Sequence, residues 1–105
     1  MNESKSNDEV VSPNYQYIKM MLTFIESEMK YPKIAKENGI QGRVFVTFVV
    51  ERDGSISNVK AMRGIGFGCD EEAIRVIQSM PKWKPARQRG ETVRCSYIIP
   101  ILFKM

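Results

Sequence analysis

The chain holds few of the residues from which enzymes build an active site. None of its 105 residues is a histidine, which excludes a Ser–His–Asp triad, a histidine metal site and the usual general base near neutral pH. Its two cysteines, Cys69 and Cys95, therefore have no histidine to activate them. We expect them either as small buried hydrophobic side chains or, in an oxidising compartment, as a disulfide. The composition thus predicts a protein that is not an enzyme and that holds no metal or other cofactor.

One short motif imitates a ligand site. Three glycines within residues 64–68 precede a helix-like segment, but the dinucleotide fingerprint would need its third glycine at Cys69. Asp70–Glu72 then place negative charge where a bound phosphate would lie. We interpret the glycines as a tightly turning connector, and Asp70 as the N-cap of a helix whose first turn is acidic.

The charge of the chain is basic, with a net value of +4. The basic side chains are densest in residues 82–94. They form either a solvated surface or a region that attracts an acidic partner and speeds association. Nucleic acid is not an expected partner, because no helix carries a basic recognition face and no aromatic-plus-basic RNA-binding signature appears.

Periodicity divides the chain into a tail and one domain. Residues 1–14 are polar and predict a flexible tail or the end of a linker, and residues 15–105 predict a single domain. Within that domain the pattern predicts helices at 15–30, 32–38 and 70–80, and strands at 43–51, 56–63 and 92–103. Asp53-Gly54 predicts the hairpin turn between the first two strands, and Trp83 is expected either on the core or stacked on a ligand.

The last strand has the pattern of an exposed sheet edge. Its apolar residues alternate without interruption from Val93 to Phe103. Pro100 has no main-chain N–H and so interrupts the row of hydrogen-bond donors along this strand. Within sheets, proline is confined to edge strands or bulges. We therefore expect an α+β domain with a three-stranded antiparallel sheet, with the strand at 43–51 in the middle and helices on one face.

Several short segments, taken in order, resemble one family. They are Tyr31-Pro32, Gly42-Arg43-Val44, Asp53-Gly54, the run from Asp70 to Ala73, Trp83-Lys84-Pro85-Ala86, and the final Ile99-Pro100-Ile101-Leu102-Phe103. In this order and spacing they resemble the C-terminal domain of the TonB family, in particular its branch from Bacteroidetes-type bacteria. The resemblance covers residues 15–105.

This resemblance implies a function. TonB-like proteins are anchored in the inner membrane, cross the periplasm and, with ExbB and ExbD, deliver energy from the proton gradient to nutrient import. Their C-terminal domain binds outer-membrane transporters when a short peptide, the TonB box, adds as a strand to the last strand of the sheet. The resemblance therefore implies a periplasmic peptide-binding domain of a protein anchored in the inner membrane, with a homodimer through the last strand as a further possibility.

The same resemblance places the candidate contacts on two segments. On the last strand they are Arg94, Ser96, Tyr97, Ile98 and Ile99. After the Tyr-Pro pair they are Lys33, Ile34 and Lys36. Pro100 is expected to limit pairing at the far end of the strand. Two other functions stay open: a TolA-like scaffold of the cell envelope, and a sensory or oligomerisation module of a larger membrane protein.

Overall fold

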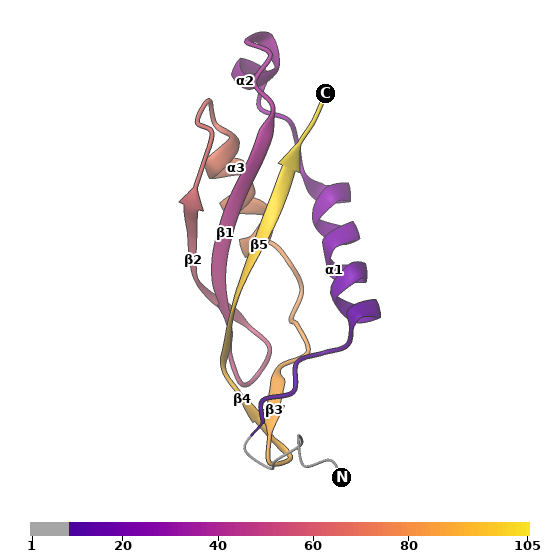
Figure 1. The fold of residues 1–105 in the computed structure, drawn as a ribbon. Helices are drawn as coiled ribbons and strands as arrows, with labels where there is room; N and C mark the ends of the chain where they lie inside the picture. The colour runs from indigo at the N-terminus through magenta and orange to yellow at the C-terminus, as the bar shows by residue number, and fades with distance from the viewer. Residues whose placement is uncertain (1–8) are drawn as a thin grey trace.

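A computed structural model describes residues 9–105 and shows a three-stranded antiparallel sheet with the strand order β2-β1-β5 (Figure 1). The strands of this sheet are β1 (Gly42–Val50), β2 (Ile56–Arg63) and β5 (Cys95–Phe103). The helices are α1 (Tyr15–Glu28), α2 (Lys33–Glu37) and α3 (Cys69–Gln78). A small separate hairpin joins β3 (Ala86–Gln88) to β4 (Glu91–Val93) at one end of the molecule.

Strand β1 occupies the middle of the sheet, as its sequence predicts. Its alternate side chains Val44, Val46, Phe48 and Val50 are completely buried. They face α3 and form part of the hydrophobic core, whereas Phe45 and Val49, on the opposite face of the sheet, are half-buried. Apolar side chains on both faces are typical of a strand in the interior of a sheet. β1 is such a strand, because β2 pairs with one of its edges and β5 with the other.

Helix α1 begins where a polar side chain can cap it. The side chain of Asn14 accepts a hydrogen bond from the Tyr17 amide at 3.0 Å, which satisfies one of the free N–H groups of the first turn. Met21 and Ile25 are the buried residues of its apolar face. The helix ends at Glu28, before the Tyr31-Pro32 pair that disfavours helical backbone.

The expected N-cap of α3 is wrong. Gly68, with φ of 86°, precedes the helix, and Asp70 lies inside its first turn. The Asp70 carboxylate instead accepts hydrogen bonds from the main-chain N–H groups of Ile65 and Gly66, at 2.9 and 3.1 Å. A Cβ atom at Gly64 would collide with this carboxylate. The acidic side chain therefore holds the glycine connector against the helix instead of capping the helix.

Trp83 packs on the core, as one of the two sequence-based interpretations holds, and is 2% exposed. Its ring contacts those of Phe48 and Tyr97, with ring centroids 5.3 and 5.6 Å apart. Its main-chain N–H donates to the Gly54 carbonyl at 2.8 Å. Gly54 adopts a φ of 87°, and a Cβ there would collide with the Trp83 carbonyl, so the hairpin turn requires glycine for two reasons.

The last strand is shorter than its sequence predicts. The expected strand at 92–103 is broken at Arg94 into β4 and β5. The reason is that β4 leaves the main sheet and pairs with β3, from Ala86↔Val93 to Gln88↔Glu91. β3 and β4 directly flank a two-residue turn at Arg89 and Gly90.

Cys69 and Cys95 are both free thiols. Cys69 is buried and Cys95 is partly exposed, so only Cys69 fits the expected buried hydrophobic side chain, and the two do not form a disulfide. Burial raises the pKa of the Cys69 thiol, and the nearby Asp70 carboxylate adds to this effect. Residues 9–105 contain no helix of the length and hydropathy needed to cross a membrane.

Candidate functional site

The two outer strands of the sheet differ in regularity. β2 pairs with β1 through two register shifts, one between Phe45 and Val46 and one between Thr47 and Val49. Within β2, Asn58 has a φ of 52°. Bulges and positive φ values bend an edge strand and protect it from pairing with another chain.

β5 is regular along its whole length. Its nine residues pair with β1 without a shift, from Gly42↔Phe103 to Val50↔Cys95. No strand within residues 9–105 pairs with its outer side. A straight, unpaired strand of this length presents a row of N–H and C=O groups to which an extended peptide can add.

One hydrogen bond shows which groups of β5 face outward. The Thr47 hydroxyl, on β1, donates to the Tyr97 carbonyl at 3.0 Å, so the Tyr97 carbonyl points toward β1. Because main-chain direction alternates along a strand, the main-chain groups of Ser96, Ile98 and Leu102 point to the free edge. Pro100 belongs to the same outward set, which explains why a residue without an N–H leaves the pairing with β1 uninterrupted.

Side chains of the candidate β5 contacts lie on both faces of the sheet. Tyr97 and Ile99 face the helices, where Tyr97 stacks on Phe48 with a centroid distance of 5.8 Å and Ile99 is 7% exposed. Burial raises the pKa of the Tyr97 hydroxyl. Ser96 and Ile98 face the opposite side, and Ile98 is 55% exposed. A peptide beside β5 would therefore pair with the main chain of Ser96 and Ile98, and Ile98 also offers its exposed side chain.

Arg94, which directly precedes β5, is already paired within the domain. Its guanidinium donates two hydrogen bonds to the Glu51 carboxylate, at 2.9 and 3.0 Å. These bonds and a third hydrogen bond, from the Ser57 hydroxyl, lower the pKa of Glu51 to about 2. The pair fixes the position of the Arg94 side chain beside the beginning of the free edge.

The three α2 candidates lie at the other end of β5. Figure 1 shows α2 beyond the start of β1, at the end of the sheet where β5 finishes. Tyr31 holds this region in place, because its ring meets that of Phe103 at 5.6 Å and its hydroxyl donates to the Ile40 carbonyl. Ile34 is 55% exposed, and Lys33 and Lys36 are exposed. The structure thus places the two groups of candidates at opposite ends of the edge and does not bring them together.

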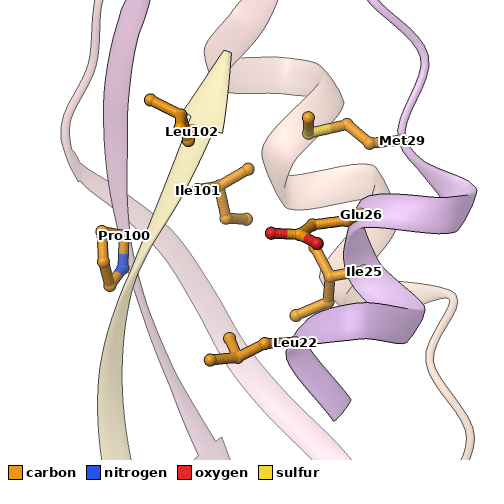
Figure 2. Close-up of a pocket in the computed structure, with 7 residues that line it drawn as sticks. All are labelled: Leu22, Ile25, Glu26, Met29, Pro100, Ile101 and Leu102. Atoms are coloured by element: carbon orange, nitrogen blue, oxygen red, sulfur yellow. The ribbon is translucent and has the colours of Figure 1, made fainter. Parts of the chain in front are cut away.

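Sequence reasoning missed a groove between α1 and β5. Figure 2 shows the residues that line it: Leu22, Ile25, Glu26 and Met29 from α1, and Pro100, Ile101 and Leu102 from β5. The four helix residues follow the spacing i, i+3, i+4, i+7, which marks one face of a helix. That spacing was visible in the sequence, but only the fold shows that this face lies along the edge of β5.

Comparison with known proteins agrees with this architecture. A family model described as "Gram-negative bacterial TonB protein C-terminal" matches residues 27–105. Among curated proteins, Protein TonB of Helicobacter pylori strain J99 is 35% identical over 48 residues, which are 46% of this chain and 17% of that protein. Protein TonB of Pseudomonas aeruginosa is 33% identical over 54 residues, 51% of this chain and 15% of that protein.

Two solved structures are similar over most of their length. Both are NMR solution structures of the Helicobacter pylori TonB C-terminal domain. The structure of its residues 194–285 has a TM-score of 0.63 and 30% identity, with 89% of this chain and 96% of that chain covered. The structure of its residues 179–285 has a TM-score of 0.69 and 24% identity, with 90% and 85% covered.

Proposed function

Because this chain belongs to the family of Gram-negative bacterial TonB protein C-terminal domains, we propose that it binds outer-membrane transporters by strand addition to β5. In this proposal a short extended peptide of the transporter, the TonB box, becomes a fourth strand beside β5. The observation that carries the proposal is the free, regular nine-residue edge. Main-chain hydrogen bonds would supply the affinity, and side chains at alternate positions would supply the specificity.

The candidate contacts have different roles in this proposal. Ser96 and Ile98 offer outward main-chain groups to the peptide, and Tyr97 and Ile99 hold the strand on the core from its other face. Arg94 lies beside the beginning of the edge. Lys33, Ile34 and Lys36 form a second contact surface at its far end. Pro100 offers no donor, so we propose that peptide pairing weakens from there on.

The remaining parts of the proposal concern the whole TonB-like protein in which such a domain would work. The matched region covers less than a fifth of the curated relatives, 17% and 15% of their length. We propose that this domain works in the periplasm, without enzymatic activity, as part of a TonB-like energy transducer anchored in the inner membrane and driven by ExbB and ExbD. Assignment to the Bacteroidetes-type branch stays a prediction.

A chemical-shift titration tests the proposal. The labelled domain is titrated with peptides that carry the TonB boxes of transporters from the same bacterium. We expect saturable shifts concentrated in residues 92–103 and 31–37, with dissociation constants in the micromolar range. A folded domain that shows no shift with any peptide would contradict the proposal and favour a TolA-like scaffold or a sensory module.

Self-association of two domains through β5 would compete with peptide binding, because both use the same edge. A titration at two protein concentrations, with sedimentation measured alongside, separates the two uses. We expect peptide to displace any dimer, because both require the outward groups of Ser96 and Ile98. A dimer that persists at saturating peptide would place the dimer contact elsewhere.

A further inference from the structure

Helix α1 lies next to the place where an added strand would pack. Figure 1 shows α1 running beside β5 on the side away from β1. A fourth strand would lie about 4.8 Å from β5 in the plane of the sheet. Its side chains on the helix side would therefore meet α1, on the face formed by Leu22, Ile25, Glu26 and Met29.

The groove on this face has apolar walls and one carboxylate. Ile25 is buried, Leu22 and Met29 are half-buried, and Glu26 is exposed. The groove holds about 80 Å³ of free space. In Figure 2 the Glu26 carboxylate extends from α1 toward Ile101 of β5.

Glu26 has no cationic partner among the residues that the structure describes. None of the ion pairs within residues 9–105 includes it. Lys30, four residues further on, lies beyond the end of α1, and its main-chain N–H donates to Glu72 at 2.7 Å. The carboxylate is therefore available to a charge from outside the domain.

We infer that this groove binds a lysine or arginine side chain of the docked peptide. Both side chains have an apolar stem that covers hydrophobic surface and a cationic head that stays at the rim. The stem would lie against Leu22, Ile25 and Ile101, and the head would pair with Glu26. This inference rests on the proposed function, because it places the peptide beside β5, and it adds a charge preference that the main-chain pairing alone does not impose.

A peptide series tests the inference. The transporter peptide that binds best in the titration is remade with a single Lys, Gln or Glu at each position in turn. Dissociation constants are measured by fluorescence anisotropy for the parent domain, for Glu26→Gln and for Glu28→Gln. Glu28→Gln is the matched control, because it removes the same charge from the same helix outside the groove.

We expect one position at which Lys binds about fivefold more tightly than Gln in the parent domain and in Glu28→Gln. In Glu26→Gln the two peptides should bind within about twofold of each other. Equal binding of Lys and Gln at every position, or a Lys preference that survives Glu26→Gln, would overturn the inference and leave strand addition intact. Failure of every peptide to bind any variant would overturn the proposed function and this inference with it.

Discussion

The chain covers one of its strand edges and leaves another open. Beside β3, Val11 donates to the Arg87 carbonyl at 2.7 Å and accepts from the Arg87 N–H at 2.9 Å, so the chain's own N-terminal side pairs with this edge. Beside β5, no strand of residues 9–105 does the same. The covered edge is three residues long and the open edge is nine. This difference supports our proposal that the transporter peptide adds to the longer edge.

Trp83 lies between the two regions: its ring packs on Tyr97 of β5, and it precedes β3 by three residues. Replacing Trp83 by Ala should cost about 3–5 kcal/mol of unfolding free energy, the largest effect predicted here, because it empties a buried aromatic site. Urea unfolding followed by circular dichroism measures it. Trp83→Phe is the milder control, and a loss below about 1 kcal/mol for Trp83→Ala would mean that the ring is not part of the core.

Two proline substitutions distinguish the outward edge of β5 from its pairing with β1. Ile98→Pro removes an N–H that points outward, so we expect peptide affinity to fall more than tenfold while the domain stays folded. Ile99→Pro removes an N–H that points toward β1, so we expect it to lower the thermal midpoint strongly. Peptide titration and thermal melts of both variants measure these effects. Normal peptide binding by a folded Ile98→Pro variant would show that β5 is not the docking edge.

A proline substitution at Val11 tests the covered edge of β3. Val11→Pro removes one of the two hydrogen bonds to Arg87 and should cost about 1 kcal/mol. We also expect faster hydrogen exchange at the Arg87 amide and a peptide affinity within about twofold of the parent value. Val10→Pro is the control. A large loss of peptide affinity in Val11→Pro would mean that the two edges are not independent.

The ion pair beside the open edge has the smallest predicted effect, and it depends on pH. The pKa of Glu51 falls from an ordinary value of 4.5 to about 2, chiefly through its hydrogen bonds with Arg94. A lowered pKa stabilises the folded state above pH 4.5, and this contribution is lost as the pH falls toward 2. The difference in unfolding free energy between the parent and Glu51→Gln should therefore shrink over that range. A difference that stays constant from pH 7 to pH 2 would contradict this assignment.

Local pattern was sufficient for most of the fold. Apolar residues on both faces of β1 predicted a central strand, and apolar residues at three- and four-residue steps predicted α1, because each pattern reflects which faces of a regular backbone are buried. Asp53-Gly54 predicted the hairpin because the turn needs positive φ. Where local pattern failed, a competing hydrogen-bond partner decided. Asp70 resembles an N-cap, but the main-chain N–H groups of Ile65 and Gly66 compete for its carboxylate.

The candidate site, like the fold, was predicted from the sequence only in part. Alternation and Pro100 identified β5 as an edge strand, since proline cannot donate to a ladder, and the resemblance to the TonB family supplied the partner that we propose. The sequence did not show which outward groups are free, that α2 lies at the far end of the edge, or that Arg94 is held by Glu51. These facts depend on register between strands, which is set by contacts between residues about fifty positions apart.

The sequence by itself determined the three helices, the three strands of the main sheet, the central position of β1 and the absence of histidine chemistry, because each follows from residue type and short-range spacing. Tertiary structure alone decided that β4 leaves the main sheet, that Val11 covers β3, and that Glu26 faces the edge of β5. The physical reason is that an edge is open or covered according to what packs beside it. That neighbour comes from another part of the chain, and no local pattern specifies it.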